Sequence, residues 1–415
     1  MKEMVRSSIF IMLTGALGAV ILSGPARGQI TRTDIDRIRK NEALSAEDLQ
    51  RLEMFIQIQF EQMELAQSGA ELNEPVRELL AITTSNSNNP LTRQQYSERL
   101  AEMVQARYMA VFQRGVNLSG QDLEALQEMG AHLKRAAALP LTVSDHPRII
   151  DDLLRLLQDD LEDVRNYAAK GFTTRNIHEY LTQVEETDAV VQKVLGGLDQ
   201  CLAQESSPEV IMQIATAANL PEKARGLTIL KKCVDKRTAQ YRLWQVESEA
   251  ADSEILHQVF LAAEQKLGAN DKRSATDLLR SAAELYWAAY QRYTRGISYR
   301  TEDGKTVPLV TDPSQQTLRT LLLVGEDGFR SICDAALQSP RSRRLFSTAI
   351  LDQNAASLSG PYDALLGAGG QVQQAFNIYD GWAAPAELPA PSAEVIQKAE
   401  NLQKIKQNSI IGKGF

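Results

Sequence analysis

Residues 153–171, LLRLLQDDLEDVRNYAAKG, predict two helices joined by an acidic turn. Leu153, Leu156 and Leu157 recur at a helical spacing and are followed by an acidic turn over residues 158–162. A second helix begins around Val164, and small residues follow it one turn later. This stretch is the starting point for the fold of the whole chain.

The same order of features resembles one unit of the HEAT family of helical repeats, in which a leucine-rich helix and a short Asp turn precede Val-Arg and paired alanines. Val210 follows Val164 by 46 residues, and alanines further along repeat this interval. HEAT and armadillo units repeat at about 40–47 residues. The second copy has Ile211 where the first has Arg165, which leaves a regular Asp–Arg ladder between units an open question.

The resemblance covers about residues 145–295 and implies an α-solenoid, an architecture that serves contact surfaces rather than one chemistry. The expected fold class is all-α, an α-solenoid-like stack of antiparallel helix pairs with one short β-hairpin insertion.

The N-terminus carries a signal for export. Lys2 and Arg6 precede an uncharged apolar run at 9–22, and small residues flank Arg27 at 26–28. The fourteen-residue run spans roughly 21 Å as a helix, less than the ~30 Å core of a bilayer. We interpret 1–28 as a signal peptide of an exported protein, periplasmic or extracellular. The competing interpretation is a buried N-terminal helix or an uncleaved anchor.

Charge limits the class of partner. Removal of residues 1–28 takes away three basic side chains and one acidic side chain, which changes the formal net charge from −8 to −10. Nucleic acid and anionic membranes require a clustered basic surface, so neither is expected as the main partner. No later segment is long and apolar enough to span a bilayer, so no stable membrane insertion of the mature chain is expected. A protein partner is expected, and the oligomeric state stays open.

Composition and periodicity divide the chain into segments. They are a signal peptide (1–28), an N-terminal helical segment (29–140), HEAT-like helical repeats (141–296), a β-hairpin with C-terminal helices (297–358), a Gly/Ala/Pro-rich linker (359–392) and a C-terminal helix with a tail (393–415). The N-terminal segment shows four helix patterns, one of which begins with a capping box at Ser45 and Asp48.

The predicted hairpin covers residues 297–310. Apolar and polar residues alternate there around Asp303 and Gly304, a pair typical of a type I′ turn with positive φ at both positions. Helices are then expected over residues 314–324, 329–338 and 341–351. The Ala/Pro run at 383–391 predicts a semi-rigid segment of polyproline character.

The sequence shows none of the usual catalytic, nucleotide-binding or zinc motifs, so we expect no catalytic residue, cofactor or metal site. The four histidines are scattered, which predicts surface or helix-end positions. They are His132, His146, His178 and His257. The carboxylates between 151 and 163 lack the spacing of a calcium loop, and helix capping explains them better.

Three cysteines are too few for a disulfide-dense secreted scaffold. Cys201 and Cys233 are expected on two helices separated by one intervening helix, so a bridge between them is conceivable. Buried free thiols are the favoured interpretation.

One aromatic cluster is the candidate binding site. Tyr286, Tyr290 and Tyr293 share one face of a predicted helix, with Trp287 beside them and Tyr299 in the hairpin. Such side chains offer apolar faces with polar edges and are suited to grip a peptide or stack on a sugar. The i, i+4, i+7 spacing is also that of a core helix face, so burial against neighbouring helices is the competing interpretation.

The hypothesis for function is an exported, non-enzymatic helical-repeat protein that provides a protein-binding or scaffolding surface. The alternative is a secreted enzyme on an α/α-toroid that acts on polysaccharide, with paired carboxylates ~5–10 Å apart.

Overall fold

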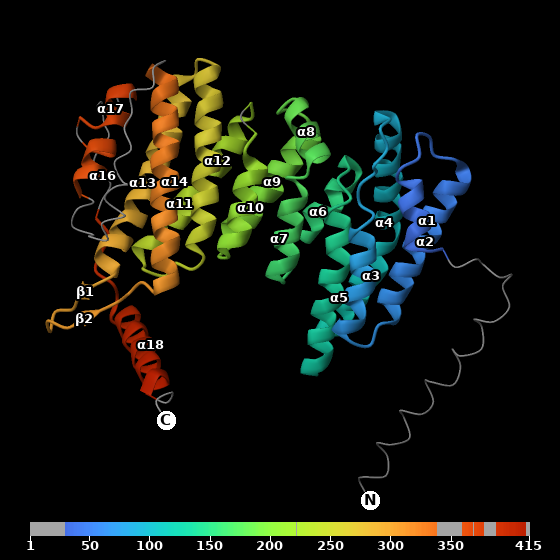
Figure 1. Cartoon of the computed structure of the whole chain (residues 1–415), viewed down its shortest axis with the longest axis horizontal. Helices are drawn as coiled ribbons and strands as arrows, with labels where there is room; N and C mark the ends of the chain where they lie inside the picture. Colours follow the sequence, from blue (N-terminus) through green and yellow to red (C-terminus); the bar gives the residue numbers. More distant parts are fainter. Residues whose placement is uncertain (1–29, 221, 338–358, 368, 377–386, 412–415) are drawn as a thin grey trace, which may run out of the picture. The chain divides into compact units, whose positions relative to one another are not determined.

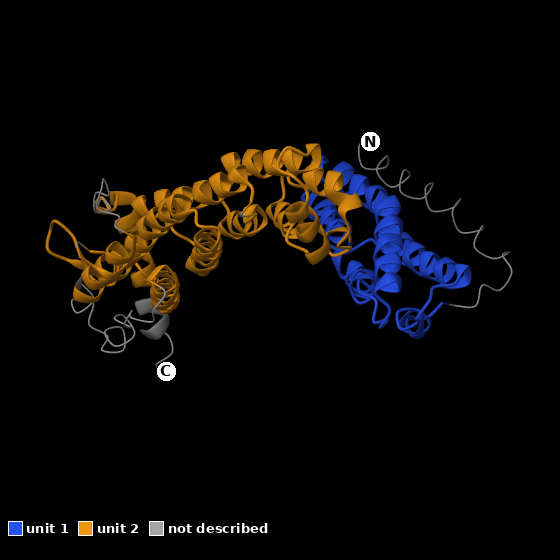
Figure 2. Cartoon of the chain, turned by 90° about the horizontal axis from the view of Figure 1, so that it is seen from above, with its two compact units in different colours: residues 1–140 blue, residues 141–415 orange. Residues whose placement is uncertain are grey.

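The computed structural model describes residues 30–220, 222–337, 359–367, 369–376 and 387–411. Helices make up most of these residues, and the strands among them are two short ones that pair in a hairpin. The chain divides into two compact units, residues 1–140 and 141–415 (Figure 2). The fold is therefore all-α with a small β-hairpin, as the sequence predicts. The expected signal peptide lies outside the described residues.

Unit 1 is a group of helices with an apolar core. Its helices are α1 (Arg32–Ile38), α2 (Ala46–Leu65), α3 (Gly69–Leu80), α4 (Pro90–Ser119) and most of α5 (Glu124–Thr142). The predicted capping box at the start of α2 is present, because the Ser45 side chain accepts from the Asp48 N–H while the Asp48 carboxylate accepts from the Ser45 N–H. Helix α2 buries Phe55, Ile56 and Phe60 and packs on α3 and α4.

Helix α1 is an addition to the four helices that the sequence predicts in this segment. It has seven residues, too few for a clear periodic pattern. Arg39 follows it and is 9% exposed. Its guanidinium donates to the carbonyls of Ala81 and Thr84 at 2.9 and 2.6 Å. The helix is therefore fixed by contacts with a loop more than forty residues away, which local sequence patterns do not encode.

Unit 2 begins in the last residues of α5 and contains the remaining elements (Figure 1). They are η1 (Pro147–Ile149), α6 (Ile150–Leu156), α7 (Glu162–Gly171), α8 (Arg175–Gln183), α9 (Ala189–Gln204), α10 (Pro208–Ala218), α11 (Ala224–Arg242), α12 (Glu249–Gly268), α13 (Lys272–Gly296), β1 (Tyr299–Arg300), β2 (Thr306–Val307), α14 (Asp312–Leu337), α16 (Ser359–Leu366), α17 (Gln371–Phe376) and α18 (Ala393–Ile411).

Apart from α8, which packs on η1, the helices from α6 to α14 form a stack of two layers. Helices α6, α9, α11 and α13 contact one another in order, and α7, α10, α12 and α14 do the same. Each helix of the first layer also packs against the next helix of the second layer, so the stack consists of successive pairs (Figure 2). Val164 and Val210 are both the third residue of their helices, α7 and α10, and both are fully buried. This packing is compatible with a helical-repeat fold.

Helix α14 is continuous between residues 324 and 329, where the sequence predicts a break between two helices. Its two glycines there serve close packing rather than helix termination. A Cβ at Gly325 would collide with the ring of Tyr286, and one at Gly328 would collide with the ring of Phe260. The glycines therefore let α14 approach α13 and α12 closely. The expected helix at 341–351 lies outside the described residues.

The hairpin forms, but its turn differs from the expected type I′. Tyr299 pairs with Val307 and Arg300 with Thr306. Gly304 has a φ of 82°, whereas Asp303 is not among the described residues with positive φ. Thr301 N–H donates to the Lys305 carbonyl at 2.8 Å, which closes a three-residue loop. A loop of this length commonly has one left-handed residue, usually Gly, and so needs only one positive φ.

The segment expected to be a linker, residues 359–392, contains the two short helices α16 and α17. Val372 and Phe376 of α17 are buried, and α17 packs on α14. Leu388 and Pro389 are also hydrogen-bonded to side chains of the stack. This segment therefore makes tertiary contacts, although its sequence contains few helix signals.

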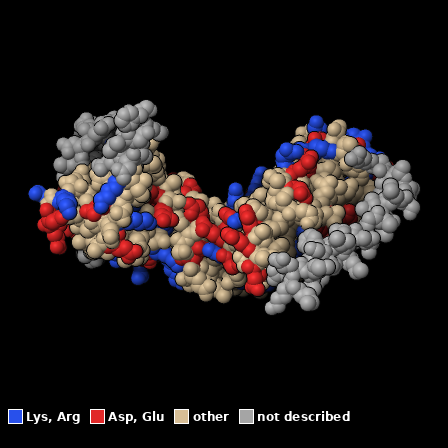
Figure 3. Space-filling view, turned by 90° about the horizontal axis from the view of Figure 1, so that it is seen from below, with Lys and Arg blue, Asp and Glu red and all other residues tan. Residues whose placement is uncertain are grey.

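Acidic and basic side chains are interspersed over the face shown in Figure 3. The drawn face has no broad area of Lys and Arg alone. Among the described helices, none has an apolar stretch long enough to cross a membrane.

Candidate functional site

The five aromatic residues of the predicted patch lie in three different surroundings. Tyr286 and Tyr293 are 0% and 2% exposed between α13 and α14. The Tyr286 hydroxyl donates to the Leu322 carbonyl at 2.9 Å, and the Tyr293 hydroxyl accepts from Arg319 Nε at 2.7 Å. Both hydroxyls are thus engaged inside the stack, and these two side chains belong to its core.

Trp287 and Tyr290 face α16. Their rings stack with centroids 5.3 Å apart, and the Tyr362 ring lies 4.4 Å from Trp287 and 5.0 Å from Tyr290. Tyr290 is 7% exposed and Trp287 is half-buried. Burial, with a further contribution from Asp363, raises the pKa of Tyr290. The stack joins α13 to α16 within the chain.

Tyr299 is half-buried in the hairpin and packs edge-to-face on Trp244, with ring centroids 6.3 Å apart. Trp244 lies in the turn between α11 and α12 and is 4% exposed. The guanidinium carbon of Arg295 lies 5.9 Å from the centroid of the Trp244 ring, a cation–π contact. The aromatic end of α13 therefore includes a tryptophan that the predicted patch does not contain.

An extended segment of the chain lies on this end of the stack. We call residues 387–391 the strap, and Trp244, Gln291 and Arg295 the Trp244 site. Trp244 Nε1 donates to the carbonyl of Pro389 at 2.9 Å, and Arg295 Nη1 donates to the carbonyl of Leu388 at 2.7 Å. The Leu388 N–H donates to Gln291 Oε1 at 2.6 Å. Three side chains thus bind main-chain groups of two successive strap residues.

The turn that carries Trp244 has an uncommon backbone conformation. Trp244 has a φ of 58°, in the left-handed region that bulky residues rarely adopt. Arg292, 5% exposed, donates to the carbonyls of Trp244 and Val246 at 3.2 and 3.3 Å. It also pairs with Glu249 at 3.3 Å. Residues that surrounding contacts hold in a rarely adopted backbone conformation cluster at functional sites, which makes this turn a candidate.

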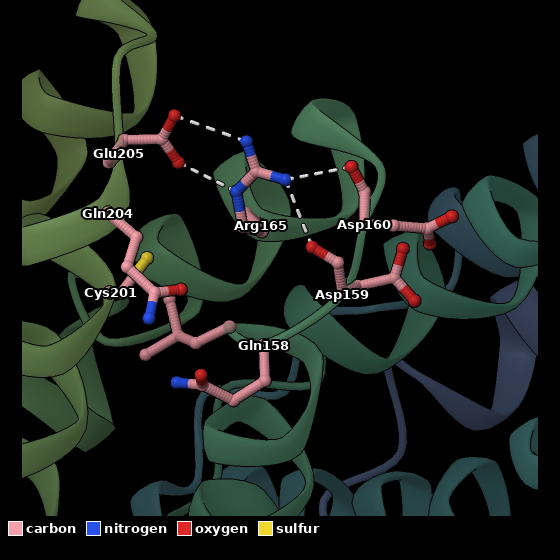
Figure 4. A pocket seen from close by; sticks show the side chains of 8 residues that line it. Gln158, Asp159, Asp160, Arg165, Cys201, Gln204 and Glu205 are labelled. Atoms are coloured by element: carbon pink, nitrogen blue, oxygen red, sulfur yellow. Dashed lines mark hydrogen bonds and ion pairs between the residues drawn. The ribbon is translucent and has the colours of Figure 1, made fainter.

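A second polar site lies where the first two helix pairs meet (Figure 4). Arg165 of α7 donates through Nε and Nη2 to the two carboxylate oxygens of Glu205 at 2.6 and 3.1 Å. Its Nη1 donates to the carbonyls of Asp159 and Asp160 at 3.0 and 2.9 Å. The Arg165 guanidinium thus joins the turn before α7 to the turn before α10.

The Arg165 link borders a pocket of about 280 Å³. Its lining residues are Leu157, Gln158, Asp159, Asp160, Arg165, Cys201, Gln204 and Glu205. Burial by itself raises the pKa of Glu205, but hydrogen bonds from Arg165, Ser207 and Ser206 outweigh it, so the pKa lies below the ordinary value of 4.5. Burial, with Glu205 nearby, raises the pKa of the Cys201 thiol to about 11. The thiol is therefore protonated at neutral pH and is a poor nucleophile.

A buried ionic group joins α11 to α12. Arg237 and Asp252 are both 0% exposed, and Arg237 Nη2 donates to Asp252 Oδ2 at 2.9 Å. The Tyr241 hydroxyl donates to the same oxygen at 2.8 Å. Burial raises the pKa of Asp252, while the bonds from Arg237 and Tyr241 oppose the shift. These side chains bind one another, and the group serves packing between helices.

The described residues contain no group of three or more His, Cys, Asp or Glu that could hold a metal ion. His146 caps η1, because its Nδ1 accepts from the Arg148 N–H at 3.2 Å. His257 is exposed, as expected for a surface histidine. Cys201, Cys233 and Cys333 are buried free thiols, which confirms the favoured interpretation of the cysteines.

Sequence reasoning missed the residues that complete the Trp244 site. Arg295 and Tyr299 attract notice because they lie in the aromatic region, but Trp244 lies more than forty positions before that region in the sequence. Leu388 and Pro389 belong to a stretch whose composition predicts a linker. The one available signal is the Leu-Pro pair within the Ala/Pro run, because an apolar residue beside proline suits an extended peptide ligand.

Comparison with known proteins adds no relative in sequence. No protein-family model matches the chain, and no curated protein matches it. Among solved structures the chain is similar to one described as "Crystal Structure of Engineered Protein", with 13% identity over 90% of this chain and 93% of the other. The TM-score of that match is 0.22, and it carries no argument about the fold.

Proposed function

We propose that this protein is an exported, non-enzymatic scaffold of HEAT-like helical repeats that binds a protein partner through unit 2. The HEAT-like assignment is supported by the equivalent positions of Val164 and Val210 in α7 and α10. Export to the periplasm or the extracellular space is supported by the charge and apolar pattern of residues 1–28.

The observation that carries the proposal is the Trp244 site, which holds an extended segment by its main chain. Main-chain recognition of an extended segment is a recurring mode of peptide binding. Trp and Arg, which dominate this site, are also the residue types enriched at protein interfaces. A stack of helix pairs supplies the rigid support that such a site requires.

Site-specific photocrosslinking tests the binding proposal. A photoreactive amino acid replaces Leu243, which is 60% exposed and adjacent to Trp244, in the protein expressed in its native envelope. The matched control places it at Leu91 of unit 1, which is 75% exposed. We expect a protein partner crosslinked at Leu243 and not at Leu91. Equal crosslinking at both positions would contradict a specific surface on unit 2.

Export is tested on the same preparation. N-terminal sequencing of the mature protein is expected to find Gln29 or a residue close to it. A product that retains Met1 would contradict cleavage of a signal peptide.

A further inference from the structure

The strap buries two side chains that are three positions apart. Leu388 is 4% exposed and Pro391 is buried, whereas Pro389 and Ala390 between them are exposed. A polyproline II helix has three residues per turn, so residues i and i+3 face the same side. The burial of Leu388 and Pro391 therefore fits the spacing of a polyproline-type segment that is held to the stack at Leu388 and Pro389.

The Trp244 site contributes contacts that suit many sequences. Its three hydrogen bonds reach the N–H and carbonyl of Leu388 and the carbonyl of Pro389. Every peptide has these carbonyls, so the hydrogen bonds provide affinity with little selectivity. Selectivity then depends on the two side chains that are buried, which gives the pattern Leu-x-x-Pro.

The site is held by helices of the stack rather than by the strap. Arg292 fixes the turn that carries Trp244, and Arg295 lies over the indole ring. Arg295 Nη1 also donates to Gln291 Oε1 at 3.2 Å, which orients that amide toward the strap. A site whose side chains are already fixed loses little conformational freedom when a ligand binds.

The strap leaves one polar group of the site without a partner. Gln291 is 3% exposed, and in the described structure its Nε2 has no hydrogen-bond partner. Its Oε1 accepts from both Leu388 and Arg295, which fixes the orientation of the amide. A ligand that places an acceptor near Nε2 would satisfy this donor, whereas the strap does not.

We propose that the Trp244 site binds an extended Leu-x-x-Pro segment of a partner protein and that the strap is its internal competitor. This inference rests on the proposed protein-binding function and names the chemistry of the partner. The strap is tethered to the site, so its effective concentration there is high and a partner binds only when it displaces the strap. A partner cannot bind while the strap occupies the site. The apparent affinity for a partner is therefore the intrinsic affinity multiplied by the fraction of molecules whose site is free.

The test uses the full mature chain and a labelled, acetylated peptide with the sequence of residues 387–392, ELPAPS. Leu388→Asp removes the buried anchor of the strap and leaves the Trp244 site unchanged. Glu387→Gln is the matched control, because Glu387 is the exposed neighbour. Fluorescence anisotropy measures peptide binding, and circular dichroism verifies that each variant is folded.

We expect Leu388→Asp to bind the peptide at least about tenfold more tightly than the wild type and Glu387→Gln. Adding Trp244→Phe to Leu388→Asp should weaken binding about three- to tenfold, because the indole N–H is lost while an aromatic ring remains. A peptide with aspartate in place of leucine should not bind. If Leu388→Asp fails to fold, Leu388→Ala is expected to show the same direction of change.

Equal affinity of the folded Leu388→Asp variant and the wild type would overturn the inference. A wild-type dimer that Leu388→Asp abolishes in light scattering would assign the site to the strap of a second copy and would also overturn it. If a partner is crosslinked at Leu243 but the peptide does not bind, this inference is rejected while the proposed function stands. The proposed function would fail independently if crosslinking at Leu243 does not exceed that at Leu91.

Discussion

Replacement of Arg165 by alanine should weaken the contact between the first two helix pairs of unit 2. Arg165 donates four hydrogen bonds, two to the carboxylate of Glu205 and two to main-chain carbonyls before α7. The side chain of Glu205 is 1% exposed and that of Arg165 is 21% exposed. The substitution therefore leaves a buried carboxylate without its cation.

The expected loss of stability depends on which interactions with the Glu205 carboxylate remain after the substitution. Removal of one partner of a fully buried ion pair costs about 3–5 kcal/mol. Glu205 keeps the N–H groups of Ser206 and Ser207, both at 2.9 Å, and water can enter beside the exposed part of the Arg165 position. We therefore expect a loss of about 2–3 kcal/mol in the free energy of unfolding.

Thermal and chemical unfolding followed by circular dichroism measures the effect. A loss of this size lowers Tm by about 5–10 °C in a domain of ~150–250 residues. Lys193→Ala is the matched control, because Lys193 pairs with Asp151 across neighbouring helices but the two side chains are 57% and 66% exposed. That change should cost less than about 1 kcal/mol. If Arg165→Ala and Lys193→Ala unfold at the same temperature, the Arg165 link does not stabilise the stack.

The pKa of Glu205 and the burial of Tyr290 give two more predictions. Because the pKa of Glu205 is lower in the folded chain than its ordinary value of 4.5, its contribution to stability is present above pH 4.5 and is lost as the pH falls through the folded pKa. In denaturant titrations below pH 5, the wild type should therefore lose more stability than Glu205→Gln, and parallel pH curves would refute this. Tyr290→Ala should lower the free energy of unfolding by about 3–5 kcal/mol, because Tyr290 is 7% exposed and stacks on Trp287 and Tyr362. A melting temperature within 1–2 °C of the wild type would instead support a surface role for this ring, since large buried truncations shift Tm by more.

The sequence by itself determined the helical class and one helix pair of unit 2, α6 with α7. Residues 153–171 contain the second half of α6, the turn after it and all of α7, so the pattern of apolar residues was enough to predict this helix pair. The interval of 46 residues then identified the equivalent position in α10, and both valines are fully buried. Such features are local, because a helix pair joined by a short turn is encoded within one stretch of chain.

The tertiary structure decided what the aromatic residues do. A spacing of i, i+4, i+7 states that Tyr286, Tyr290 and Tyr293 share a helix face but not which element covers that face. Helices α14 and α16 cover these rings. In the sequence the two glycines of α14 indicate a break between helices, whereas in the structure they allow close packing. The Trp244 site joins residues 145 positions apart, Trp244 and Pro389. Contacts of this kind depend on how the stack brings distant segments together, so no local pattern could have identified them.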